Sequence, residues 1–370
     1  MNIPFVNLRA QYEFLKPKIH DRINKVLEHG GYIMGPEVSE LEERLKAFTN
    51  SKYCITVSSG TEALLISLMA LGVGRGDEVI TTPFTFAATI EVIVLLGATP
   101  IFVDIEHDTC NLDTKLLEEK ISINTKAIIP VSLYGQPANM DEINNVAARH
   151  GNIAVVEDGA QSFGSTYKNE KSCNLSKIGC TSFFPSKPLG CYGDGGAIFT
   201  NDESIAHACR EIRIHGQSDR YIHSRVGVGG RMDTLQCAIL LAKLDHFDQE
   251  ILNRSRLGNI YNELLDEAGI SRVMQKQDRT SVFAQYTIFT NRRKLVQEKL
   301  MAAGFPTAIH YPVPMNEQPA YKDFCCAGCT PVAQKVAGKV LSLPMSAYLR
   351  EEDIVKIVGA ISRISYELQL

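Results

Sequence analysis

Short apolar runs alternate with helical patterns through the first half of the chain, and few folds accommodate this alternation. The apolar runs have the length of strands and cover residues 53–57, 78–82, 100–103, 126–131 and 153–157. Segments with helical periodicity fill the gaps, at 61–71, 87–96, 116–121 and 140–150. Strands that alternate with helices form βαβ units, whose strands run parallel in one sheet. The pattern therefore predicts an α/β domain with a mostly parallel central sheet.

The second half of the chain has a different pattern. Two more β-rich runs, at 178–184 and 195–200, are followed by helical patterns from 203 to 267. Beyond residue 269, a strand pattern at 282–289 precedes helical patterns at 293–303 and 351–365. A chain of 370 residues is too long for one typical compact domain. We therefore expect a large α/β domain over residues 1–245, which includes the N-terminal segment, and a smaller α+β domain over residues 246–370.

Composition and charge exclude several classes of protein. Hydrophobic residues make up 45% and charged residues 22%, as in globular proteins rather than disordered chains. The net charge of -4, without basic blocks, argues against a nucleic-acid partner. No apolar stretch approaches the roughly 20 residues of a membrane helix, and the first residues lack the pattern of a secretory signal. We expect a cytoplasmic protein that binds neither nucleic acid nor membrane.

Ten cysteines are scattered along a chain that otherwise has the sequence of an intracellular protein. The reducing cytosol disfavours disulfides. Cys325, Cys326 and Cys329 form a close cluster, but zinc sites usually take a second pair of ligands at suitable spacing, and none stands nearby. We therefore expect free thiols in a surface loop and predict no metal site.

A candidate phosphate site lies where the first apolar run meets the helical pattern that follows it. The segment reads Ser58-Ser59-Gly60-Thr61-Glu62. Gly60 allows a close approach to the backbone, Thr61 offers a backbone N–H and a hydroxyl, and a helix N-terminus offers oriented donors. The same residues also fit a capping box, because Glu62 follows Ser59 by three positions. The segment alone is compatible with both interpretations.

Two charged side chains follow β-rich runs further along the chain. Asp158 stands just past the apolar run at 153–157, and ligands of open parallel sheets bind at the carboxyl ends of strands. A carboxylate there can pair with a cationic ring nitrogen, or it can cap a helix. Lys187 lies between Pro185 and Pro188, just before glycines. A desolvated lysine in such a rigid turn can form a Schiff base with an aldehyde cofactor.

Together these sites match the requirements of pyridoxal phosphate (PLP). This cofactor needs a lysine at its aldehyde carbon, a carboxylate at its ring nitrogen and a cup for its phosphate. Lys187, Asp158 and the pair Gly60 and Thr61 supply these groups. The combination is far more specific than any one of its parts, and it predicts a PLP-dependent enzyme.

The sequence resembles the PLP-dependent sugar-nucleotide aminotransferases of the DegT/DnrJ/EryC1/StrS family, which have the PLP-dependent transferase fold of type I. The resemblance covers nearly the whole chain. The matching segments are GPEV at 35–38, SGT at 59–61, PFTF at 83–86, EDGAQ at 157–161, SFFPSK at 182–187, GDGG at 193–196 and HYP at 310–312. The chain is most similar to bacterial aminotransferases that act on UDP-2-acetamido-2-deoxy-3-oxo-glucuronate in the synthesis of surface polysaccharides such as lipopolysaccharide.

The resemblance implies a role for each matching residue of the cofactor site. Lys187 is implied to bond to the cofactor and to act as the acid and base of the proton shift. Asp158 is implied to bind the pyridinium nitrogen, Gln161 to lie near the ring or its 3-hydroxyl, and Phe86 to stack on the ring. The residues implied to hold the phosphate are Gly60, Thr61 and Ser182. Without the resemblance, Phe86 is a core aromatic and Ser182 a polar residue in a strand.

The resemblance also implies residues that bind the substrate. Arg231 has a planar fork that suits a carboxylate or a phosphate, although on its own it is better explained as part of a structural salt bridge. His310 and Tyr311 are implied to close the substrate pocket from the smaller domain. An isolated histidine such as His310 is more often structural.

A homodimer with shared active sites is implied as well. In the family, the loop that corresponds to residues 227–233 reaches the neighbour's cofactor phosphate. Gly229 replaces an asparagine that family members often carry in this loop. A backbone N–H or a water must therefore replace the amide of that asparagine, or the contact is absent.

The implied reaction is a ping-pong transamination. L-glutamate gives up its amino group, the cofactor passes through pyridoxamine phosphate, and a UDP-linked keto sugar leaves as an amino sugar. Three alternatives stay open: the same chemistry on a dTDP-3-keto-6-deoxyhexose or a 4-keto sugar nucleotide, PLP chemistry without transamination, and a non-catalytic scaffold or sensor. Family dehydratases carry histidine in place of the lysine, so Lys187 counts against the second. The intact set of cofactor residues counts against the third.

Overall fold

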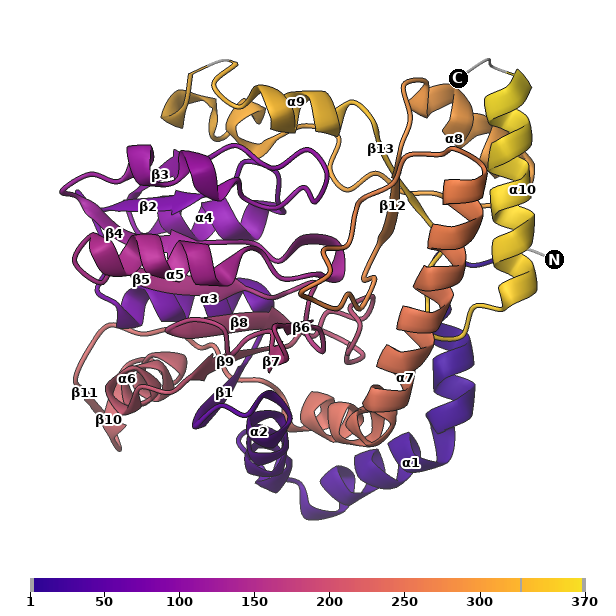
Figure 1. The fold of residues 1–370 in the computed structure, drawn as a ribbon. Helices are drawn as coiled ribbons and strands as arrows, with labels where there is room; N and C mark the ends of the chain where they lie inside the picture. The colour runs from indigo at the N-terminus through magenta and orange to yellow at the C-terminus, as the bar shows by residue number, and fades with distance from the viewer. Residues whose placement is uncertain (1–2, 327, 368–370) are drawn as a thin grey trace.

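A seven-stranded sheet forms the centre of the larger part of the molecule in the computed structural model, which describes residues 3–326 and 328–367 (Figure 1). The strands lie in the order β1 (Tyr53–Val57), β9 (Gly196–Thr200), β8 (Ile178–Ser182), β5 (Ala154–Asp158), β4 (Thr125–Ile129), β2 (Glu78–Thr81) and β3 (Thr99–Phe102). From β8 to β3 all neighbours are parallel, whereas β9 runs antiparallel to both of its neighbours. The predicted mostly parallel sheet is confirmed.

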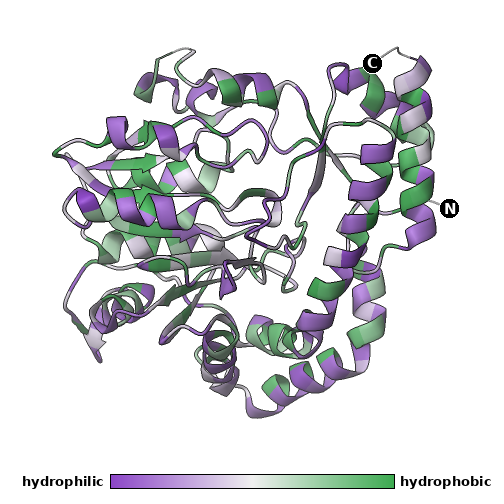
Figure 2. Cartoon of the chain, viewed as in Figure 1, coloured by the Kyte–Doolittle hydropathy of each residue, from purple (hydrophilic) through white to green (hydrophobic). Residues whose placement is uncertain are grey.

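Helices cover both faces of this sheet, because successive strand residues point to opposite sides. On one face, α3 (Gly60–Ala70), α4 (Ala87–Leu95) and α6 (Glu203–Arg213) share one apolar core. On the other face, α5 (Met140–Arg149) packs over β4 and β5, and α2 (Pro36–Thr49) packs over β1 and β9. Figure 2 shows hydrophobic residues gathered on the sheet and on the helix faces that meet it.

The smaller part of the molecule is built around one antiparallel strand pair. β12 (Tyr286–Phe289) pairs with β13 (Val340–Leu343), and α8 (Arg293–Ala302) and α10 (Glu351–Glu367) share its apolar core. α9 (Pro331–Ala337) instead packs with Phe84, Val131 and Leu133 of the larger part (Figure 1). The long helix α7 (Thr234–Glu267) contributes Leu257 and Tyr261 to the core of this part and also packs against α1 (Leu8–His29) and α2. Residue 245, where we expect the domain boundary, lies inside α7, and the division into two domains stays a prediction.

Several elements differ from the sequence pattern. The helix expected over 116–121 is two 3₁₀ turns, η1 (Thr114–Leu116) and η2 (Glu118–Lys120). The helical stretch expected from 203 to 267 is interrupted after α6 by a hairpin of β10 (Gln217–Asp219) and β11 (Ile222–His223). The strand expected from 282 begins only at Tyr286, because Phe283 has a positive φ of 44°.

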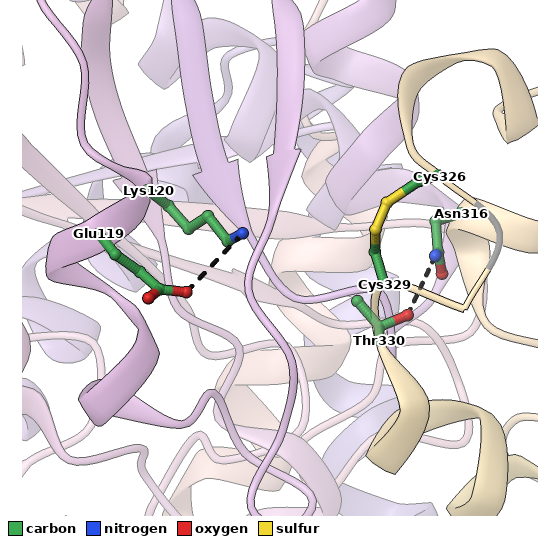
Figure 3. The surroundings of a disulfide bond; sticks show 6 residues. All are labelled: Glu119, Lys120, Asn316, Cys326, Cys329 and Thr330. Atoms are coloured by element: carbon green, nitrogen blue, oxygen red, sulfur yellow. Dashed lines mark hydrogen bonds and ion pairs between the residues drawn. A yellow bond between two sulfur atoms is a disulfide. The ribbon is translucent and has the colours of Figure 1, made fainter.

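The cysteine cluster also differs from expectation. Cys326 and Cys329 form a disulfide, so the prediction of free thiols is wrong for these two residues (Figure 3). A tight turn, in which the Cys329 N–H donates to the Cys326 carbonyl over 3.3 Å, brings the two side chains together. Cys325 keeps a free thiol.

None of the helices in the described ranges is both long and apolar enough to cross a lipid bilayer.

Candidate active site

The polar residues predicted from sequence gather at the carboxyl edge of the parallel strands. Asp158 is the last residue of β5, Ser182 is the last residue of β8, and Gly60 opens α3 just after β1. The parallel pairing of β5 with β8 brings the ends of these strands side by side. This edge is where open α/β sheets bind their ligands.

The N-terminus of α3 lies directly against the end of β8. Ser59 caps the helix by accepting a hydrogen bond from the Glu62 N–H at 3.0 Å. A Cβ on Gly60 would come within 2.6 Å of the Ser182 Cβ, so only glycine permits this approach. The first N–H groups of a helix lack intrahelical partners and attract anions. Together with the hydroxyls of Thr61 and Ser182, they form a cup whose chemistry suits a phosphate.

Asp158 is buried at the centre of this edge. Its carboxylate accepts hydrogen bonds from the Thr89 hydroxyl at 2.9 Å and from the Ala160 N–H at 3.2 Å. Burial raises the pKa of Asp158, while the Thr89 bond and the Lys187 charge oppose that rise. A buried carboxylate with few donors gains from a cationic partner. Thr89, on α4, supports this carboxylate but stands in none of the sequence motifs.

Lys187 lies in the turn that follows β8. Its backbone N–H donates to the Phe184 carbonyl at 2.8 Å, and no hydrogen bond or ion pair holds its amine among the described residues. Burial lowers the pKa of Lys187, and the charge of Asp158 partly opposes that effect. A desolvated amine of this kind is more often neutral and hence nucleophilic.

A second lysine stabilises the turn that carries Lys187. Lys243, on α7, is buried, and its amine donates to the Gly190 carbonyl at 2.6 Å and lies over the Tyr192 ring at 4.2 Å. Burial lowers the pKa of Lys243 to about 8. Sequence patterns did not indicate Lys243, because nothing in a long helix distinguishes one lysine from its neighbours.

Gln161 joins the larger part of the molecule to the smaller part. Its carbonyl oxygen accepts from the Tyr134 N–H at 2.8 Å, and its amide donates to the Tyr311 hydroxyl at 3.1 Å. The Tyr134 hydroxyl in turn donates to the His310 carbonyl. The His310 ring bonds to the Ser342 hydroxyl at 3.0 Å, and burial and the Lys187 charge lower the pKa of His310 to about 4. The imidazole is therefore neutral at physiological pH.

Phe86 stands at the mouth of a cavity of about 450 Å³. Its side chain is 58% exposed, which excludes the alternative of a core aromatic. Its ring centroid lies 6.2 Å from that of Tyr311. Pro312, Met315 and Tyr321 line the same cavity, so residues of both parts of the molecule form its walls.

Arg231 belongs to a loop that runs beside the α3 N-terminus. The Ser58 N–H donates to the Gly230 carbonyl at 2.9 Å, which fixes the loop there. Arg231 is half-buried and forms no ion pair among the residues that the structure describes, so the salt-bridge alternative has no support within the chain. At Gly229, a Cβ would meet the His215 ring at 3.1 Å. The imidazole of His215 thus lies beside the position where the family often has an asparagine.

Each polar group that pyridoxal phosphate needs has a counterpart at this edge. The α3 cup suits the phosphate, the buried Asp158 suits a protonated ring nitrogen, and Lys187 offers an amine of lowered pKa. The donor set therefore fits the cofactor.

Comparisons with known proteins agree with this geometry. The model of the DegT/DnrJ/EryC1/StrS aminotransferase family matches residues 14–362. The chain is 54% identical, over 97% of its length and 99% of the relative, to the UDP-2-acetamido-2-deoxy-3-oxo-D-glucuronate aminotransferase of Pseudomonas aeruginosa.

Two solved structures have the same fold. A DegT DnrJ EryC1 StrS aminotransferase from Brucella abortus has a TM-score of 0.95 and 38% identity, with 98% of this chain and 99% of that chain covered. The ntda protein of Bacillus subtilis with bound cofactor PMP has a TM-score of 0.90 and 29% identity, with 98% and 85% covered.

These findings identify the cofactor as pyridoxal phosphate and the predicted fold as that of the PLP-dependent aminotransferases. The chain belongs to the DegT/DnrJ/EryC1/StrS aminotransferase family.

Proposed function

We propose that this aminotransferase moves the amino group of L-glutamate to C3 of UDP-2-acetamido-2-deoxy-3-oxo-glucuronate. The observation that carries the proposal is the 54% identity to the Pseudomonas aeruginosa enzyme along nearly the full length of both chains. The product is an amino sugar nucleotide for bacterial surface polysaccharides such as lipopolysaccharide, and the reaction takes place in the cytoplasm.

Each residue at the candidate cofactor site is proposed to contact a different part of pyridoxal phosphate. When bound, pyridoxal phosphate supplies an electron sink for the electrons of the broken Cα–H bond. The Asp158 carboxylate keeps the ring nitrogen protonated, and the α3 cup with Thr61 and Ser182 anchors the phosphate. Gln161 orients the ring edge and Phe86 covers a ring face. The support for these assignments is the burial of Asp158 and the contact of Gly60 with Ser182.

Lys187 holds the cofactor at rest and moves protons during turnover. Its amine takes the proton from the Cα of glutamate, and in the second half-reaction it returns a proton to C3 of the sugar. The lowered pKa of Lys187 supports this role, because a base must be unprotonated before it accepts a proton. Lys243 fixes the turn that carries Lys187.

Arg231 is proposed to bind the C6 carboxylate of the uronate, while His310 and Tyr311 close the pocket. A half-buried guanidinium without an ion pair in the described chain supports this role for Arg231. A bidentate charge-assisted pair contributes about 1.5–3 kcal/mol. The ratio of kcat/KM for the uronate to that for its neutral C6-hydroxymethyl analogue is therefore expected to fall in Arg231→Ala. An equal loss for both substrates would instead favour a role in bracing the loop.

A homodimer with shared active sites completes the proposal. Large apolar side chains are exposed on two segments, Tyr32, Ile33 and Met34 after α1, and Tyr221, Ile222 and Val226 around the β10–β11 hairpin. Exposed apolar side chains in such groups favour burial against another surface. Symmetric association of identical chains is the commonest solution.

Transfer of ¹⁵N tests the proposed reaction. The enzyme is incubated with ¹⁵N-glutamate and a panel of keto sugar nucleotides, which are the UDP-3-oxo-uronate, its neutral analogue, a dTDP-3-keto-6-deoxyhexose and a 4-keto sugar nucleotide. Mass spectrometry is expected to find ¹⁵N in the product of the UDP-uronate with the highest kcat/KM. Faster amination of another sugar would replace the substrate, and no amination of any sugar would contradict the function.

A further inference from the structure

A cluster of three cysteines stands outside the candidate active site. Cys325 follows the turn η5 (Lys322–Phe324), and Cys326 and Cys329 precede α9. The three sulfur atoms lie within 4.8 Å of one another, and two of them, those of Cys326 and Cys329, are joined in a disulfide (Figure 3). None of the catalytic or cofactor roles above uses these residues.

Reduction of the disulfide would leave three sulfurs close enough to share one thiophilic metal ion. A tetrahedral zinc ion lies about 2.3 Å from each thiolate, so the freed sulfurs of Cys326 and Cys329 would have to move to roughly 4 Å apart. The chain directly after the cluster is anchored. The Asn316 amide donates to the Thr330 hydroxyl at 3.0 Å, and Asp104 accepts from the Val332 and Ala333 N–H groups at 2.8 and 2.9 Å.

The other cysteines of the chain have a different environment. Seven of them are buried and unpaired, and burial raises the pKa of thiols such as Cys173 and Cys180. Buried neutral thiols are poor metal ligands and inert toward reagents. By contrast, Cys326 and Cys329 are exposed and Cys325 is partly exposed. Among the cysteines, exposed thiol chemistry is thus confined to this one cluster.

We propose that the reduced cluster of Cys325, Cys326 and Cys329 binds one zinc ion through three thiolates, and that the disulfide is the metal-free, oxidised form of the same site. The fourth position is left to water, because three ligands converge there among the residues that the structure describes. Zinc binding and disulfide formation exclude each other, since both need the sulfurs of Cys326 and Cys329.

Oxidation of the cluster balances with a low-molecular-weight disulfide as the oxidant. The thiolates of Cys326 and Cys329 form one S–S bond and give up two electrons, and the oxidant's S–S bond breaks to yield two thiolates. The zinc ion leaves with water in its ligand positions. Thiol–disulfide exchange of this kind passes through a mixed disulfide.

The cluster lies beside the cavity that Phe86 and Tyr311 line. Cys325 packs with Ile90, Phe102 and Met315, and Met315 and Tyr321 line the cavity of about 450 Å³. A change at the cluster therefore occurs next to one wall of this cavity.

Cobalt binding tests the site directly. The PLP-loaded enzyme is reduced, freed of metal and titrated with Co²⁺ without oxygen. We expect thiolate-to-cobalt charge-transfer bands, and ligand-field bands at red wavelengths where the cofactor does not absorb. Both sets of bands should saturate at one equivalent of Co²⁺ and disappear when Zn²⁺ is added. Cys326→Ser and Cys329→Ser should each weaken binding more than about ten-fold, and Asp323→Asn, in the neighbouring turn, should not change it.

Counting the reactive thiols tests whether disulfide formation and metal binding exclude each other. Because the other cysteines are buried, the native reduced enzyme should offer three thiols to Ellman's reagent, and the enzyme oxidised with glutathione disulfide should offer one and bind no Co²⁺. The proposal is overturned if the reduced enzyme gives no thiolate–cobalt bands, or if Cys326→Ser keeps them.

Discussion

At the residue scale, the hydrogen bond from Thr89 affects whether Asp158 can hold a protonated ring nitrogen. Its buried carboxylate depends on the Thr89 hydroxyl, since the only other donor in the described chain is the Ala160 N–H. Burial raises the pKa of Asp158 and thereby favours its neutral form, and a neutral acid cannot stabilise a pyridinium. Thr89 is therefore a positioning residue for the cofactor.

Replacement of Thr89 tests this dependence. Thr89→Val is expected to weaken PLP binding about ten-fold, which corresponds to about 1.4 kcal/mol for a hydrogen bond to a charged group. Absorbance titration of the apoenzyme with PLP measures the change. Thr89→Ser keeps the hydroxyl and should restore affinity, whereas an equal loss in both variants would show that only packing is affected.

His310 makes the stability of the protein depend on pH. Its pKa falls from 6.5 in the unfolded chain to about 4 in the folded chain. Between these values the unfolded chain binds a proton that the folded chain does not, so His310 contributes its full stability above pH 6.5 and loses it as the pH falls toward 4. Urea midpoints at pH 7 and pH 5 should differ more for the wild type than for His310→Gln. Equal differences would show that His310 has no part in the acid sensitivity.

At the scale of elements, the contact between α3 and β8 shapes the phosphate cup. In Gly60→Ala, the new methyl group would collide with Ser182 and push the helix away from the strand. We expect the free energy of unfolding to fall by about 1–3 kcal/mol and PLP affinity to fall with it. Gly74→Ala, where the methyl group meets open space, is the matched control. Unchanged PLP affinity in Gly60→Ala would mean that the cup does not hold the phosphate.

Part of the candidate cofactor site follows from the alternating pattern. Gly60 and Asp158 lie at the ends of strands, so the pattern indicates one shared edge, and Lys187 lies in a proline-bounded turn after β8. The roles of Phe86, Gln161 and Ser182 rest on the family resemblance and stay predictions. Thr89 and Lys243 were not predictable, because each is an ordinary residue inside a helix whose role depends on packing against a distant segment. The β10–β11 hairpin was also missed, since its short strands have no apolar alternation to distinguish them from a loop.

At the scale of the whole molecule, the proposed dimer makes each active site depend on two chains. If both residues serve the reaction, Lys187→Ala is expected to be inactive and Arg231→Ala to keep only a small fraction of the wild-type activity on the uronate. If Arg231 serves the partner's site, random exchange of subunits gives half heterodimers with one intact site of two, or about a quarter of wild-type activity. Activity that stays at the level of the separate variants, after exchange is verified by mass spectrometry, would contradict shared sites.

The account depends most on Lys187 as the lysine that carries the cofactor. Borohydride reduction of the PLP-loaded enzyme fixes the cofactor on its lysine, and peptide mapping by mass spectrometry then locates the phosphopyridoxyl group. We expect the label on Lys187 alone, and we expect Lys187→Ala to remain folded, to take up no label and to lose transamination. A label on Lys243 or on any other lysine would contradict the proposed active site.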